Sequence, residues 1–345
     1  MPNLIVYKIL KAAIIAAVFL ILTGCTYDSQ YLVNAVAKEP IKKTVWLAYW
    51  DLNAGEKDLQ LTPNSVEKLS FFAAYFDKDD RVFVPIELSN KKSELNNKIN
   101  KYETYLTFVN DKQSASGSCV MKDIEVLRRV FADDVTIEKH IDDIIALTLQ
   151  GGYDGIEVDY ERIWKDESVG KSFMKFADKL YKRAIDNNLK LRIVLEPRAP
   201  FASNDFPKGP EYVVMLYNLN GLHSDPGPKA NKEFIQKTIT KMKALPGSNS
   251  VAFSTGGCLW GSDGKKRFLT EAEAKHLADK KEAEIKRDEQ SQCIVFEYVE
   301  GGITYQVWYA DVKTLNYWIS IAKVEGVNNI SLWRLGGNID INKII

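Results

Sequence analysis

Short apolar runs alternate along the chain with segments in which apolar residues recur every three or four positions. The short runs predict buried strands, and the three- and four-residue spacing predicts helices that bury one face. Strand-like runs occupy residues 45–50, 69–76, 105–109, 191–197, 212–218, 251–254 and 329–333. Helical spacing is found at residues 123–130, 137–149 and 173–184.

Residues 151–161 form one more candidate strand, in which acidic and apolar residues alternate. Glu157, Asp159 and Glu161 would line one face, because alternate residues of a strand point to the same side. Like charges at this spacing raise the pKa of at least one carboxyl group, so that it can keep its proton near neutral pH. Asp154 falls outside this register and is expected to order the entry of the strand.

An alternating acidic strand has two interpretations. The commoner one is an amphipathic edge whose carboxylates lie in water. Here a helical segment, residues 137–149, comes directly before a Gly-Gly break and the acidic run. Helix, turn and strand in this order favour an α/β fold. Eight strands that alternate with helices predict a (β/α)8 TIM barrel, in which the C-terminal strand ends surround the active site.

Residues 154–161, Asp-Gly-Ile-Glu-Val-Asp-Tyr-Glu, resemble the DGxDxDxE signature of glycoside hydrolase family 18, which contains chitinases and endo-β-N-acetylglucosaminidases. One position differs, because Glu157 stands where the family has Asp. Residues 215–218, Met-Leu-Tyr-Asn, are similar to the MxYD or MxYN segment of the family. Trp333, at the end of the last strand, resembles the Trp that lies under the sugar ring.

The resemblance implies a retaining, substrate-assisted glycosidase that cleaves β-linked N-acetylglucosamine glycans without a metal or organic cofactor. Glu161 would be the general acid and base. Asp159 would hold the N-acetyl group of the substrate, and Glu157 would share a proton with Asp159. Tyr217 would donate a hydrogen bond to the same acetamido group, and Trp333 would stack under the ring. The predicted substrate-binding set also contains Met215, Asn218 and Tyr49.

The Glu157 side chain is one methylene longer than Asp, and a misplacement of about 1 Å can cost roughly a hundredfold in rate. Reduced activity or a shifted pH optimum is therefore expected, with Glu157→Asp retaining activity. The alternative is a surface glycan-binding protein that keeps the barrel without turnover. Family members of that kind generally lack the acid, which is present here as Glu161.

The interval between the seventh and eighth strands is long. It contains a charged helical pattern at residues 271–286 and two apolar runs, 293–298 and 303–309, joined across Gly301 and Gly302. A glycine turn between two apolar runs predicts a small β-hairpin insertion. Asp311 precedes another helical pattern. Its position is explained equally well by a role as helix N-cap and by a functional role.

The N-terminus predicts export. Two lysines precede an uncharged run too short to span a bilayer, and residues 22–25, Leu-Thr-Gly-Cys, resemble a bacterial lipobox. Cys25 would carry the lipid, although a signal anchor or an ordinary cleaved signal has the same general form. The expected location is the cell envelope outside the cytoplasm, and the outer membrane in a host with two membranes. The predicted division is a signal peptide at 1–24, a lipid-anchored tether at 25–44 and a catalytic barrel at 45–345.

The charge composition of the chain bears on the kind of partner that it binds. The chain has 46 Lys and Arg against 46 Asp and Glu, so it lacks the basic excess of nucleic-acid-binding proteins. The expected partners are a glycan and a membrane, and the expected state is a monomer. The three histidines are scattered without ligand spacing, which indicates no metal site. Cys258 and Cys293 either pair and leave Cys119 free, or all three are small buried apolar residues.

Overall fold

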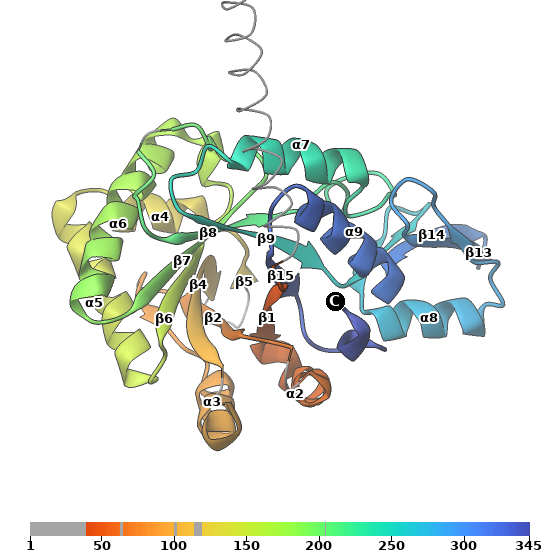
Figure 1. Ribbon diagram of the computed structural model, residues 1–345, viewed down its shortest axis with the longest axis horizontal. Coiled ribbons are helices and arrows are strands. Elements are labelled where there is room, and N and C mark those ends of the chain that lie inside the picture. The colour runs from red at the N-terminus through yellow and green to blue at the C-terminus, as the bar shows by residue number, and fades with distance from the viewer. Residues whose placement is uncertain (1–38, 63–64, 100–101, 114–118, 204) are drawn as a thin grey trace, which may run out of the picture.

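The computed structural model describes residues 39–62, 65–99, 102–113, 119–203 and 205–345. Eight parallel strands close into a barrel, with helices around the outside (Figure 1). The barrel strands are β1 (Lys42–Ala48), β2 (Lys68–Phe76), β4 (Glu103–Gln113), β6 (Gly155–Asp159), β7 (Lys190–Leu195), β8 (Glu211–Met215), β9 (Ser248–Ser254) and β15 (Asn329–Trp333). Each strand pairs in parallel with its neighbour, and β15 closes the ring against β1. The predicted (β/α)8 barrel and its eight strand positions are confirmed.

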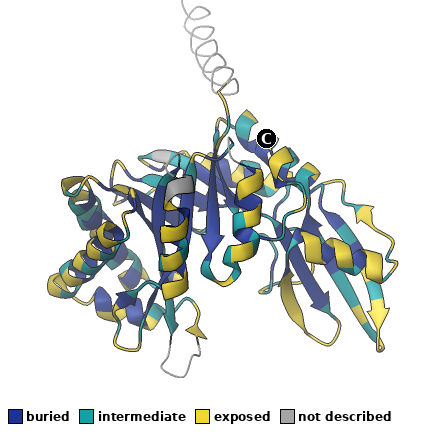
Figure 2. Cartoon of the chain, turned by 90° about the horizontal axis from the view of Figure 1, so that it is seen from below, coloured by how far each residue is buried: buried dark blue, intermediate teal, exposed yellow. Residues whose placement is uncertain are grey.

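The helices bury one face each, so their outer surfaces are exposed, and all but one of them cover the barrel (Figure 2). They are α2 (Leu52–Leu61), α3 (Ile86–Ile99), α4 (Ile124–Val130), α5 (Asp134–Gln150), α6 (Glu167–Asp186), α7 (Lys232–Met242), α8 (Glu271–Lys280) and α9 (Val312–Val324). The segments that contain α2 and α3 are rich in polar residues and were not predicted to be helices.

Acidic N-caps set where several helices begin. Asp123 accepts from the backbone of Glu125 and Val126, and Asp133 forms a capping box with Thr136. Such caps satisfy N–H groups that have no partner inside the helix, each stabilising it by about 1 kcal/mol. Asp311 caps α9 by accepting from the Thr314 N–H, so the capping interpretation of Asp311 holds.

The insertion between β9 and α9 is larger than the predicted hairpin. That hairpin is present as β13 (Ile294–Glu300) and β14 (Ile303–Ala310), which lie beside the barrel (Figure 1). They belong to a five-stranded antiparallel sheet covered by α8, which ends six residues before the predicted limit. The remaining strands are β10 (Gly256–Gly261), β11 (Lys266–Leu269) and β12 (Lys286–Arg287). The short segments β3 (Val82–Phe83) and β5 (Cys119–Val120) extend the barrel sheet.

The cysteine pairing considered above does not form. Cys258 and Cys293 are buried free thiols, and Cys119 is an exposed one. Cys258 lies on β10 and Cys293 next to β13, and both strands pair with β14 between them. Two strand spacings are about 9.6 Å, which exceeds the Cα separation that a disulfide spans.

The predicted signal peptide and Cys25 lie outside the described residues. Within the described part of the chain, no helix is both long and apolar enough to cross a bilayer.

Candidate active site

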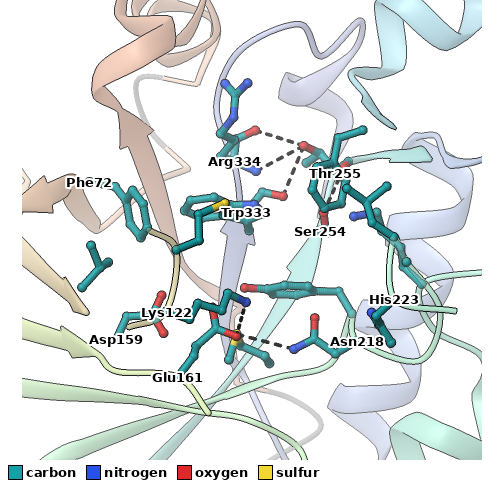
Figure 3. A pocket seen from close by; sticks show the side chains of 18 of the residues that line it. Phe72, Lys122, Asp159, Glu161, Asn218, His223, Ser254, Thr255, Trp333 and Arg334 are labelled. Carbon is teal, nitrogen blue, oxygen red and sulfur yellow. Dashed lines mark hydrogen bonds and ion pairs between the residues drawn. The ribbon is translucent and has the colours of Figure 1, made fainter. Parts of the chain in front are cut away.

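A cavity of about 540 Å³ opens at the C-terminal ends of the barrel strands. This is the end of the barrel where the predicted acids were expected. Most of the predicted site residues line it, and several are visible in Figure 3. They are Asp159, Glu161, Met215, Tyr217, Asn218 and Trp333. Glu157, Tyr49 and Asp154 are not among its lining residues.

Asp159 is the last residue of β6 and faces the cavity. Its Oδ1 atom is buried and has no hydrogen-bond partner among the described residues. Burial raises the pKa of Asp159 well above its ordinary value, and repulsion by Glu161 raises it further. A buried acceptor without a hydrogen bond is unfavourable in free energy. This oxygen can therefore accept a hydrogen bond from a bound molecule.

Glu161 follows the strand, and its backbone is held from both sides. The Asn110 amide oxygen accepts from the Glu161 N–H at 2.9 Å, and its amide nitrogen donates to the Glu161 carbonyl at 3.1 Å. The next residue, Arg162, has a left-handed backbone (φ 65°) and donates its N–H to Glu196 at 2.9 Å. These contacts fix the backbone of Glu161 at the end of β6.

Lys122 forms an ion pair with the predicted acid. Its Nζ lies 2.5 Å from Oε2 of Glu161, at the wall of the cavity (Figure 3). The Lys122 N–H donates to Asp111 at 2.7 Å, which orders the turn that carries the lysine. The two side chains are 31% and 15% exposed, so the pair is only partly screened by water. The ammonium group therefore holds the Glu161 side chain at the wall of the unliganded cavity.

Glu157 lies inside the barrel, below the cavity. Its carboxylate forms an ion pair with Arg192 at 3.0 Å and accepts from Thr107 at 2.7 Å and from Ser70 at 3.1 Å. Trp46 donates its indole N–H to the same group. Thr107 and Arg192 are the register partners of Glu157 on β4 and β7, so all three point into the barrel. The described contacts of Glu157 do not include a hydrogen bond to Asp159.

Tyr217 and Trp333 complete the central part of the cavity. Burial raises the pKa of Tyr217 well above its ordinary value, and the negative charge of Asp159 raises it further. Its phenol therefore remains a hydrogen-bond donor. Trp333 packs edge-on against Phe72, with ring centroids 4.6 Å apart, which fixes its orientation (Figure 3).

The remaining predicted residues lie elsewhere. Asp154 is at the opposite end of β6, where its carboxylate accepts from the Thr104 N–H at 2.7 Å and hydroxyl at 2.8 Å. These bonds fit the structural role expected of it. Tyr49 packs edge-on against Trp50 and Tyr75 behind the cavity wall. Trp50 takes the place expected of Tyr49, since it is 50% exposed and lines the cavity.

Sequence reasoning missed Asn110, Lys122 and Trp50. Trp50 adjoins a predicted strand end, which was a usable signal. Asn110 and Lys122 reach Glu161 from 51 and 39 positions away, and no local pattern marks such contacts. Among the described residues, no group of three or more His, Cys, Asp or Glu side chains is placed to hold a metal ion.

No family model matches the chain. Over 235 residues the chain is 24% identical to an uncharacterized glycosylase, YvbX, of Bacillus subtilis, a match that covers 62% of this chain and 66% of that protein. The chain spans between about half and two thirds of the length of the curated relatives it matches.

Solved structures share the fold at low sequence identity. The spore cortex-lytic enzyme SleL of Bacillus cereus superposes with a TM-score of 0.73 and 16% identity, over 89% of this chain and 73% of that one. A chitinase from Chromobacterium violaceum gives 0.72 and 16%, over 88% and 96% of the two chains. The chain therefore has the barrel fold found in chitinase-like and cortex-lytic glycosidases.

Proposed function

We propose that the protein is a retaining glycoside hydrolase that cleaves β-linked N-acetylglucosamine-containing glycans by a substrate-assisted mechanism. The observation that carries the proposal is the buried, unpartnered Oδ1 of Asp159 beside Glu161 in the cavity. An acetamido N–H of the substrate is a donor of the right kind for this acceptor. The glycosidase names of similar proteins support the same class of reaction.

In the proposed reaction Glu161 donates its proton to the glycosidic oxygen and later removes one from the attacking water. Asp159 binds the acetamido N–H, so that the acetamido carbonyl oxygen attacks the anomeric carbon. The phenol of Tyr217 donates to that carbonyl oxygen and orients it. Trp333 stacks under the reacting sugar.

The ion pair between Lys122 and Glu161 must open before Glu161 can reach the glycosidic oxygen. This contact is the specific observation in favour of the second candidate function, a glycan-binding protein on the same barrel with little or no turnover. The two candidates differ in one outcome, because a binding protein retains ligand without releasing product.

The test of the mechanism is a matched pair of substrates. An N-acetylglucosamine oligomer and its de-N-acetylated form have the same linkage but differ in the internal nucleophile. We expect the N-acetylated oligomer to be cleaved with retention of anomeric configuration, as monitored by nuclear magnetic resonance. The de-N-acetylated oligomer should not be cleaved. Equal rates on both would overturn substrate assistance.

We also propose that the mature protein is anchored to the cell envelope through lipidated Cys25. Incorporation of a labelled fatty acid by the full chain, and its loss in Cys25→Ser, would support this. Incorporation that persists in the variant would contradict it.

A further inference from the structure

The Lys229 side chain is a buried cation beside the candidate active site. It lies in the segment between β8 and α7, is only 9% exposed, and lines the cavity. Within the described parts of the chain, its ammonium group has no hydrogen bond and no ion pair. Lysine is almost never buried in this way unless it is paired.

The groups near Lys229 do not replace a counterion. Its Nζ lies 4.9 Å from the centre of the Phe268 ring, and this cation–π contact contributes about 0.5–2 kcal/mol. Removing an ammonium group from water costs several kcal/mol. Burial accordingly lowers the pKa of Lys229, and the groups that oppose this shift are the thiols Cys258 and Cys293, without a carboxylate. Among the described residues, no carboxylate forms an ion pair with Lys229.

Hydrogen bonds hold the backbone of this segment in place. The Lys229 carbonyl accepts from the Leu219 N–H at 3.1 Å. The insertion holds the same loop, because Trp260 donates to the carbonyl of Ser224 at 3.1 Å and Lys266 donates to it at 2.8 Å. The cation is therefore held between the barrel and the insertion sheet.

Phe268 supplies the second part of a binding site. It lies on β11 of the insertion, is 59% exposed and lines the same cavity. An exposed aromatic ring offers an apolar face to a sugar, while the neighbouring ammonium offers a charge-assisted hydrogen bond. A neutral homopolymer would use the ring and leave the ammonium unpaired.

We propose that Lys229 and Phe268 form a subsite on the insertion side of the cavity that binds a glycan unit carrying a carboxylate. The subsite deepens the proposed function and rests on it, since it names an acidic N-acetylglucosamine-containing glycan as the substrate class. The carboxylate belongs either to an ether substituent on a 2-acetamido sugar of the chain or to a terminal acidic sugar.

The test is a calorimetric binding titration with the full chain carrying Glu161→Gln, so that no ligand is consumed. The ligands are an oligosaccharide of alternating N-acetylglucosamine and its 3-O-lactyl derivative, the methyl ester of that oligosaccharide, and a sialylated N-glycan with its desialylated form. We expect a charged ligand to bind at least tenfold more tightly than its neutral partner. Whichever pair shows the difference identifies the source of the carboxylate.

Lys229→Met in the same background should reduce this preference to less than twofold. Lys237→Met, an exposed lysine on α7, is the matched control and should retain the preference. Thermal unfolding checks that both variants fold, and Lys229→Gln replaces Lys229→Met if the latter does not. Equal binding of charged and neutral ligands, no binding of any charged ligand, or a preference that survives Lys229→Met would overturn the subsite.

The wild-type rate on neutral N-acetylglucosamine oligomers separates this proposal from the proposed function. Cleavage without a carboxylate preference would contradict only the proposed subsite. A Lys229-dependent preference without cleavage of any substrate would contradict only the proposed enzymatic function.

Discussion

Glu157 and Arg192 form a fully buried ion pair inside the barrel, with Nη1 3.0 Å from Oε2. Glu157, which stands where the DGxDxDxE signature has Asp, is thus paired with a residue of the neighbouring strand β7. Removing one member of a buried pair leaves an uncompensated charge, which costs about 3–5 kcal/mol. We predict that Arg192→Met lowers the free energy of unfolding by that amount in urea denaturation.

The exposed Arg198→Met is the control and should change stability by less than about 0.5 kcal/mol. Glu157→Asp should also destabilise, since the shorter side chain cannot keep its contacts with Arg192, Thr107 and Ser70 together. A loss below about 1 kcal/mol in Arg192→Met would show that the pair is not a structural requirement.

Lys122 holds the Glu161 carboxyl group in an ion pair, whereas the proposed reaction needs this group free to reach the glycosidic oxygen. Lys122→Met should therefore increase kcat at pH 7 by about three- to tenfold, equivalent to about 0.6–1.4 kcal/mol in the barrier. Lys122→Arg should keep the wild-type rate, and the exposed Lys313→Met serves as the control. A decrease in kcat beyond tenfold in Lys122→Met would mean that the lysine assists the reaction.

Trp50 is half exposed at the cavity, and Arg334 lies over its ring at 5.7 Å. We predict that Trp50→Ala raises KM about tenfold, which corresponds to about 1.4 kcal/mol of lost stacking, with little change in kcat. Leu61→Ala, a substitution of a similarly exposed residue on α2, should leave KM unchanged. Steady-state kinetics on one oligosaccharide distinguishes the two variants, and an unaltered KM in Trp50→Ala would place the sugar elsewhere.

His140 is buried, and its Nε2 lies 2.7 Å from the Tyr160 hydroxyl. Burial lowers the pKa of His140 to about 3, against an ordinary value near 6.5 in the unfolded chain. The unfolded state binds the extra proton between these two values, so stability is complete above pH 6.5 and falls as the pH drops toward 3. The slope is about 1.4 kcal/mol per pH unit.

His140→Gln removes this titration. The stability difference between wild type and the variant should therefore shrink by about 2 kcal/mol between pH 7 and pH 5. The exposed His276→Gln should show no such change. A pH-independent difference in His140→Gln would mean that the histidine is not held neutral in the folded protein.

The barrel could be predicted from sequence because most of its strands contain a short apolar run and lie between helical segments, while β6 carries the alternating acidic pattern. Two strands of the insertion, β10 and β11, were not predicted. β10 begins with Gly256 and Gly257, and β11 is mostly exposed and starts with Lys266 and Arg267. Glycines at both ends leave β10 only three apolar side chains, and β11 has no apolar run that would identify a strand.

The same difference separates the site residues. Asp159, Glu161 and Trp333 come at strand ends, so the barrel topology alone places them near one another. The pairing of Glu157 with Arg192 follows from strand register, and Lys122 and Lys229 reach the cavity from loops. Register and loop paths depend on the whole fold, and local patterns do not specify them.

The most direct measurement is the release of reducing ends from an N-acetylglucosamine oligomer by wild type and Glu161→Gln, with ligand binding measured on the same samples. We predict that wild type cleaves the oligomer. Glu161→Gln should still bind it, but its cleavage rate should be at least about a hundredfold lower, as expected for loss of a general acid. Binding by both proteins with cleavage by neither, or equal cleavage by both, would contradict the assignment of Glu161 as the catalytic acid.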